Sequence, residues 1–194
     1  MNTRHADTRQ HILETGQRIV ACKGFSSVGL NELLQAAEVP KGSFYHYFKS
    51  KELFGQAVLE AYFDGYLGQI DRLFATPGLS ARKRLLAYLR QWQHSQSGAS
   101  DDAKCLVVKL GAEVADLSEA MRLTLRDGTT RIIDRLARCI ADGAVDGSLP
   151  ALEPLATART LYQLWLGASL LAKLSRDDSP LAQAWESSLT LLSA

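Results

Sequence analysis

The sequence predicts an all-α protein, and three observations carry this prediction. Apolar residues recur at helical spacing along nearly the whole chain of 194 residues. No stretch shows the alternation of apolar and polar residues that is typical of a strand. Glycine, proline and capping residues separate the periodic stretches from one another. We therefore expect about nine to ten helices, with three in a small N-terminal domain and the others in a larger C-terminal domain.

Composition excludes several classes of protein. The chain is 46% apolar, which is sufficient for a core, and its net charge at pH 7 is +1. No uncharged apolar run reaches the roughly 18 residues of a membrane span, and the polar stretch from Met1 to Arg9 is unlike a signal peptide, so we expect a cytoplasmic protein without membrane contact. Three cysteines without paired spacing and four scattered histidines predict no disulfide framework, metal site, cofactor or catalytic residue.

The first three helices are closely spaced, and the second and third are short. Gly24 is placed to end the first helix, and Gly29 is placed as the N-cap of the second. Glu38 and Val39 then form a tight turn, and Pro40 stands where a helix start tolerates a missing N–H. The three helices are expected at Thr8–Lys23, Asn31–Ala37 and Pro40–Phe48.

The third of these helices carries three aromatic residues and a histidine between cations. Phe44 and Phe48, four residues apart, are expected to face inward. The remaining side chains suit a polyanion, so the second and third helices are interpreted as a helix-turn-helix with Pro40–Phe48 as the recognition helix. Residues 1–51 carry seven Lys and Arg against four Asp and Glu, whereas the remainder carries fifteen against seventeen. The candidate contacts to DNA are Asn31, Lys41, Gly42 and Ser43 for base edges, and Tyr45, His46, Tyr47 and Lys51 for phosphates.

Six further helices are predicted after Ser50, which is the N-cap of the first of them. Its apolar pattern runs from Leu53 to Phe74, so this helix is expected to leave the small domain and continue into the larger one. The later helices are expected at Ser80–Ser95, Lys104–Ala115, Leu117–Gly143, Glu153–Ser175 and Pro180–Leu192, with a polar loop at Gln96–Ala103.

The stretch Glu153–Ser175 is apolar on more than one face, so it has to be buried on more than one face. The central helix of a monomer would satisfy this pattern, and so would a helix shared between a protomer core and a partner. With the last helix beside it, two such helices from each of two subunits would form a four-helix interface. The candidate interface residues are Trp165, Trp185 and Leu189.

The three cysteines are the reactive side chains of interest. Cys22 lies at the end of the first helix and Cys139 on an amphipathic helix, and both are expected to be small buried hydrophobes. Cys105 opens a helix between Lys104 and Lys109, and both a helix N-terminus and nearby ammonium groups lower the pKa of a thiol. An inert buried thiol is the alternative at this position.

Lys173 is the one cation within the apolar stretch Thr160–Leu174. If its stem is buried, its ammonium needs an anionic partner, which could be a carboxylate such as Glu113 or the thiolate of Cys105. Alternatively, the ammonium reaches solvent near the end of the helix.

At the helix-turn-helix the chain resembles the TetR family of bacterial repressors. The family pattern is matched by Ala36-Ala37-Glu38-Val39-Pro40-Lys41-Gly42-Ser43 and by Tyr45-His46-Tyr47-Phe48-Lys49-Ser50-Lys51-Glu52. Gly29 replaces the usual Ser or Thr cap, and Glu38 stands where glycine is common, so the turn is expected to be strained or differently shaped. The resemblance implies a DNA-binding domain at residues 1–52, a regulatory and dimerisation domain at residues 53–194, and a homodimer that binds a palindromic operator in double-stranded DNA.

Beyond the helix-turn-helix, the chain looks like the NemR-like branch of that family. The resemblance lies in Lys104–Leu110, Ala112–Val114, Asp116–Arg122 and Leu164–Lys173. It implies relief of repression when a cysteine reacts with an electrophile or oxidant, and it assigns the sensor roles to Cys105 and Lys173.

Three functional hypotheses therefore stand. The first is a repressor released when Cys105 is modified, and the second is a repressor released by a non-covalent drug or small carboxylate in the C-terminal domain. The third, from another class, is a small thiol-dependent enzyme. It lacks support because no Cys-x-x-Cys occurs and His46, the histidine nearest a tyrosine, lies on the recognition helix.

Overall fold

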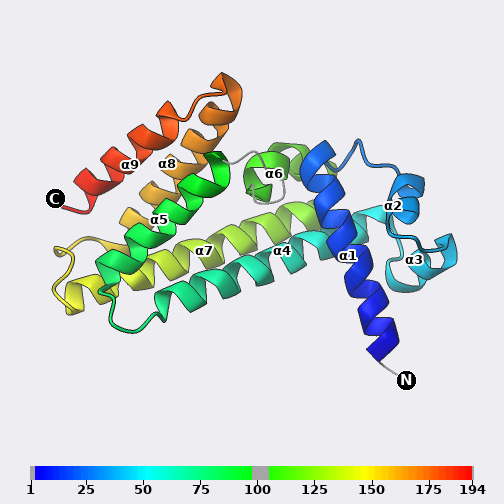
Figure 1. Ribbon diagram of the computed structural model, residues 1–194, viewed down its shortest axis with the longest axis horizontal. Helices are drawn as coiled ribbons and strands as arrows, with labels where there is room; N and C mark the ends of the chain where they lie inside the picture. The colour runs from blue at the N-terminus through cyan, green and yellow to red at the C-terminus, as the bar shows by residue number, and fades with distance from the viewer. Residues whose placement is uncertain (1–2, 98–104, 194) are drawn as a thin grey trace. The chain divides into compact units, whose positions relative to one another are not determined.

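The computed structural model describes residues 3–97 and 105–193, and the regular secondary structure of these residues is entirely α-helical, as predicted (Figure 1). Nine helices occur in this described part of the chain. They are α1 (Thr3–Lys23), α2 (Leu30–Ala36), α3 (Lys41–Tyr47), α4 (Lys51–Phe74), α5 (Ala81–Ser97), α6 (Leu106–Leu117), α7 (Glu119–Val145), α8 (Pro154–Ser175) and α9 (Ser179–Leu191).

The observed boundaries differ from the predicted ones by a few residues. Helix α1 begins at Thr3 rather than Thr8, and α5 continues to Ser97 into the predicted polar loop. The rest of that loop and Lys104 lie outside the described residues. Pro40 is the N-cap of α3 rather than its first helical residue, and Cys105 is the N-cap of α6.

The chain forms two compact units. The first unit is Met1–Gly65 with Ser100–Gly128, and the second unit is Tyr66–Ala99 with Thr129–Ala194. The division therefore falls within α4 and within α7, and the helix-turn-helix shares its unit with α6. The predicted domain boundary between residues 52 and 53 stays a prediction.

An aromatic cluster forms the core of the helix-turn-helix. The ring of Phe44 lies 5.4 Å from that of Phe48 and 5.4 Å from that of Phe54 on α4, measured between centroids. All three residues are buried. Gly16 of α1 is required here, because a Cβ at this position would lie 2.2 Å from the Phe54 ring. The cluster holds α3 against α1 and α4, so the polar side of α3 is left facing outward.

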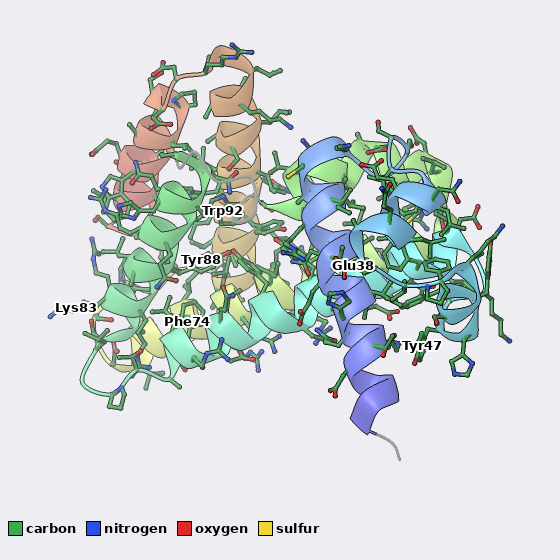
Figure 2. The ribbon with its side chains drawn as sticks, turned by 45° about the vertical axis from the view of Figure 1, so that its right-hand side comes forward. Glu38, Tyr47, Phe74, Lys83, Tyr88 and Trp92 are labelled. Atoms are coloured by element: carbon green, nitrogen blue, oxygen red, sulfur yellow. The ribbon has the colours of Figure 1, made fainter. Side chains whose placement is uncertain are left out.

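The second unit has its own aromatic core. Tyr88 and Trp92, one turn apart on α5, pack ring to ring at 5.9 Å (Figure 2), and Trp92 lies 6.0 Å from Trp165 of α8. Both indole N–H groups are satisfied, because Trp92 donates to Ser169 Oγ and Trp165 donates to Ser188 Oγ, each at 3.0 Å. The second of these bonds ties α8 to α9, which run side by side (Figure 1). No helix in the described part of the chain combines the length and apolarity that crossing a bilayer requires.

Candidate DNA-binding surface and regulatory site

The turn between α2 and α3 contains a left-handed residue. Glu38 has a φ of 52°, a conformation that favours glycine, so the unusual turn expected at this position is confirmed. The turn is closed by backbone bonds, since the N–H of Val39 donates to the carbonyl oxygen of Leu34 at 3.1 Å. At the start of α2, Gly29 is the N-cap with extended backbone, as predicted.

The structure leaves the polar residues of the recognition helix α3 accessible. Phe44 and Phe48 are buried, with 0% and 3% of their surface exposed, which confirms their inward placement. The candidate DNA contacts are distributed as follows: Lys41, Gly42, Tyr45, His46 and Asn31 of α2 are exposed, whereas Ser43 and Tyr47 are partly exposed. Tyr47 projects from the last turn of α3 (Figure 2).

Gly42 has no structural role within the protein that would require glycine. A Cβ at this position would meet no atom within 4 Å, and its backbone is helical. Glycine in a helix costs up to about 1 kcal/mol relative to alanine. A glycine that the fold does not need is therefore a candidate for close approach to a partner. The neighbouring Lys41 ammonium lies 5.9 Å from the centroid of the Tyr45 ring, one turn further along the same exposed side.

Lys51 is placed differently from the other DNA candidates. Its ammonium donates to the carbonyl oxygen of Phe25 at 3.0 Å and lies 4.7 Å from the centroid of the Phe25 ring. Sequence spacing gave no sign of this contact, because the two residues are 26 positions apart. The side chain therefore helps to hold the turn between α1 and α2.

The same turn is also held by α6. The ammonium of Lys109 donates to the carbonyl oxygen of Cys22 at 2.9 Å. Glu113, one turn further along α6, accepts the backbone N–H of Phe25 at 3.2 Å and that of Ser26 at 2.5 Å. Glu113 was one of the partners considered for Lys173, but its carboxylate binds the turn between α1 and α2. Sequence reasoning missed this role.

Cys105 is the N-cap of α6, and although part of the residue is exposed, its thiol is largely enclosed by protein atoms. The hydroxyl of Tyr62 on α4 donates to its Sγ at 3.8 Å. Burial raises the pKa of the Cys105 thiol above its ordinary value, and this effect outweighs the hydrogen bonds from Val108, Tyr62 and Val107, which lower it. The predicted lowering of this pKa is therefore wrong, because Lys109 points to the Cys22 carbonyl and does not compensate for desolvation.

The other two cysteines differ from each other. Cys139 is buried, as predicted, and its Sγ donates to the carbonyl oxygen of Ala81 at 3.4 Å. Burial, followed by the nearby Asp142 carboxylate, raises the pKa of Cys139 to about 12. Cys22 was expected to be buried but is exposed, because it lies on the outer side of the last turn of α1. Any thiol reagent therefore meets Cys22 as well as Cys105.

One of the dimer-interface residues predicted on α8 and α9 has to be corrected. Trp165 is completely buried within its own protomer, so it has no exposed area left to bury against a second subunit. Trp185 and Leu189 are partly exposed, and the guanidinium of Arg90 stacks 3.5 Å from the centroid of the Trp185 ring. Lys173 is exposed near the end of α8, and its contact with Cys105 stays a prediction.

The large exposed apolar residues of α8 lie elsewhere on the helix. Leu170, Leu171 and Leu174 are 47%, 56% and 71% exposed. Gly167, one turn before Leu171, is also exposed and has no atom within 4 Å of where its Cβ would lie. An apolar stripe with a glycine on it allows another helix to approach closely. The described residues contain no cluster of three or more potential metal ligands.

Together, the helix-turn-helix of the first unit and the all-helical second unit define a DNA-binding regulator of transcription. Residues 12–58 match the family described as bacterial regulatory proteins, tetR family, and residues 81–188 match the tetracyclin repressor-like C-terminal domain. The chain belongs to the tetR family, as its sequence pattern predicted, and it is a regulator rather than an enzyme.

Individual relatives agree with this assignment. The HTH-type transcriptional repressor NemR of Escherichia coli strain K12 is 45% identical over 94% of this chain and 92% of its own length. The transcriptional regulator AcuR of Cereibacter sphaeroides is 35% identical over 89% of this chain and 79% of its own. The crystal structure of reduced E. coli NemR superposes with a TM-score of 0.89 over 94% of this chain and 95% of that one.

Proposed function

We propose that this protein is a homodimeric transcriptional repressor that binds a palindromic operator and leaves it when the thiol of Cys105 reacts with an electrophile or oxidant. Membership in the tetR family supports operator binding and dimerisation, and the similar E. coli protein is named a repressor. The observation that carries the sensing step is that Cys105 begins α6, the helix that holds the turn leading into the helix-turn-helix.

On DNA, α3 occupies the major groove, and the two copies in a dimer read half-sites about 34–36 Å apart. The exposed Lys41 and Gly42, the partly exposed Ser43 and the exposed Asn31 of α2 face base edges. Tyr45, His46 and Tyr47 serve as phosphate contacts. Lys51 is reassigned to positioning, because its ammonium is committed to the Phe25 carbonyl.

The dimer forms through α8 and α9. The exposed leucines of α8 supply the apolar area, and Gly167 marks the point of closest approach between the two copies of the helix. Because a two-fold interface is self-complementary, the same stripe meets its own copy. Trp185 and Leu189 of α9 lie at its margin.

The chemistry of sensing by an N-ethylmaleimide-like reagent is addition. The Cys105 thiol first gives up its proton, its sulfur forms a bond to one carbon of the activated double bond, the π bond breaks, and the adjacent carbon takes up a proton. No group leaves, so the adduct adds its full volume at the start of α6. Overpacking of a core costs about 1–3 kcal/mol, which is enough to shift a balance between two arrangements of the protein.

One observation favours release by a non-covalent ligand instead. Burial raises the pKa of the Cys105 thiol, so less of it is thiolate at neutral pH than in an exposed cysteine, and alkylation is slowed. A drug or small carboxylate held in the C-terminal domain would need no thiolate.

The test uses a DNA fragment selected by binding to the reduced protein. Its Kd is measured by fluorescence anisotropy before and after N-ethylmaleimide for the wild type and for Cys22→Ser, Cys105→Ser and Cys139→Ser. We expect Cys105→Ser to bind normally and to ignore the reagent, while the other two variants are released. Release of Cys105→Ser as readily as the wild type would overturn sensing at Cys105 and assign it to another thiol, the exposed Cys22 first. A fully alkylated wild type that still binds the fragment tightly would support the non-covalent ligand.

A further inference from the structure

The turn between α1 and α2, residues 24–29, is held by charged side chains from outside the helix-turn-helix. Lys109 of α6 donates to the last turn of α1 at the Cys22 carbonyl, and Glu113 of α6 accepts the N–H groups of Phe25 and Ser26. Lys109 and Glu113 are four residues apart and therefore project from the same side of α6. We call these two residues the α6 clamp.

The α6 clamp satisfies backbone groups that the helix end leaves without partners. Helix α1 ends at Lys23, and Gly24, with a φ of 87°, turns the chain away. Carbonyl groups of the last turn and the N–H groups that follow therefore lack helical partners. A lysine near a helix C-terminus and a carboxylate on backbone N–H groups both make charge-assisted bonds. Although burial by itself raises the pKa of Glu113, the bonds from Ser26 and Phe25 and the charge of Lys51 more than offset it and lower that pKa.

The clamped turn also determines where α2 begins. The Phe25 side chain is buried, and a Cβ on Gly55 of α4 would lie 2.5 Å from its ring and 2.6 Å from the sulfur of Met121. The N–H of Phe25 is bound by Glu113 of α6 and its carbonyl by Lys51 of α4, so Phe25 is fixed to both of these helices. Leu30, the first residue of α2, follows five residues later, so a displacement of the turn is passed on to α2 and the α3 beside it.

Helix α6 connects the clamp to Cys105 without a break. The N–H of Lys109 donates to the Cys105 carbonyl oxygen at 3.1 Å, which is a bond of the first turn of the helix. Glu113 lies two turns from Cys105, about 12 Å along the axis. A helix of this length moves as a stiff body, so a shift at its N-cap displaces both clamp residues.

We propose that Lys109 and Glu113 are the positioning residues through which the state of Cys105 controls the helix-turn-helix. The inference rests on the proposed function, since it names the route by which modification of Cys105 weakens operator binding. In the reduced protein the clamp holds the turn in the DNA-competent position. When an adduct displaces the start of α6, the clamp carries the turn with it or releases it.

The experiment measures the ratio of operator Kd values with and without an N-ethylmaleimide adduct on Cys105, in a Cys22→Ser, Cys139→Ser background. Mass spectrometry verifies that Cys105 is fully alkylated in every sample. The reference protein should show a ratio of roughly ten to a hundred. Glu113→Ala should reduce the ratio to below about three, and Glu113→Gln, which keeps an acceptor oxygen, should recover part of it.

Asp116→Ala is the matched control, because Asp116 is an exposed carboxylate on the same helix outside the clamp. Its ratio should equal that of the reference protein. Hydrogen exchange gives a second readout: the amides of Phe25 and Ser26 should lose protection in Glu113→Ala but not in Asp116→Ala. If Glu113→Ala does not fold, as judged by circular dichroism, Lys109→Met replaces it with the same expected loss of ratio.

The outcomes separate the two proposals. If the reference protein, fully alkylated, binds operator as tightly as before, thiol sensing fails and this inference fails with it. If alkylation weakens operator binding of the reference protein and of both clamp variants by the same Kd ratio, thiol sensing stands. The proposal that the α6 clamp transmits it is then overturned.

Discussion

The hydroxyl of Tyr62 on α4 donates a hydrogen bond to the sulfur of Cys105 across 3.8 Å. This contact favours the thiolate, but it is outweighed by burial, and the net effect is a pKa of Cys105 above its ordinary value. A raised thiol pKa means that the reactive form is scarce below the ordinary pKa and grows as pH rises through the raised one.

The pH dependence of alkylation should show this directly. In a Cys22→Ser, Cys139→Ser background, the rate of Cys105 alkylation should keep rising with pH beyond the ordinary thiol pKa of about 8.5. Tyr62→Phe removes a bond that lowers the pKa, so it should slow alkylation further at neutral pH. Lys173→Ala in the same assay tests the predicted contact with Cys105 and should also slow alkylation. A rate that levels off below pH 8 would mean that Cys105 is an activated thiol.

Gly42→Ala should have opposite effects on stability and on operator binding. Alanine improves helix propensity, and its Cβ meets nothing in the protein, so the free energy of unfolding should rise by up to about 1 kcal/mol. Operator affinity should fall because the added methyl group stands at the DNA surface. Gly65→Ala is the control, since Gly65 is equally open within α4 and should gain stability without losing affinity. Unchanged affinity in Gly42→Ala would remove this residue from the interface.

Glu38→Gly should stabilise the protein. A left-handed conformation costs a non-glycine residue about 1–2 kcal/mol, and glycine avoids this cost. Because glycine is more flexible in the unfolded chain, about 0.5–1 kcal/mol of the stabilisation is lost again. Chemical denaturation should therefore show an increase of up to about 1 kcal/mol. Glu38→Ala removes the same carboxylate but keeps the Cβ, so it should show no comparable gain. Equal stabilisation in both variants would attribute the effect to charge rather than to backbone strain.

Lys51→Ala should weaken the helix-turn-helix itself. Loss of the bond to the Phe25 carbonyl and of the contact with its ring should lower the free energy of unfolding by about 1–2 kcal/mol. Lys49→Ala, an exposed neighbour, should leave stability nearly unchanged. The salt dependence of operator binding separates the two roles of Lys51: a slope reduced by about one unit would restore it to the phosphate contacts.

Leu171→Arg should disrupt the dimer. A charge on the exposed stripe of α8 would have to be desolvated between the subunits, so sedimentation should show monomers and operator affinity should be lost. Val145→Arg changes a residue that is even more exposed, at the end of α7, and should remain dimeric. Monomers from Trp185→Arg together with a stable Leu171→Arg dimer would place the interface on α9.

The helix-turn-helix could be predicted because its signals are local. Caps at Gly24 and Gly29, the unusual turn at Glu38 and the inward pair Phe44 and Phe48 depend on backbone conformation and on neighbours within a few residues. Such features follow from residue type and spacing, so the order of the helices and the exposed side of α3 were recognisable from the sequence.

The regulatory contacts could not be predicted in the same way. Cys22 and Glu113 lie on helices whose apolar patterns are readable, but a pattern shows which side of a helix avoids water and not what covers it. The bonds of the α6 clamp join residues 87 and 88 positions apart, and no local signal marks them. Tertiary packing alone decided that Trp165 is enclosed in its own protomer, and that desolvation outweighs the helix terminus at Cys105, because burial and the pKa of a thiol depend on every group that surrounds it.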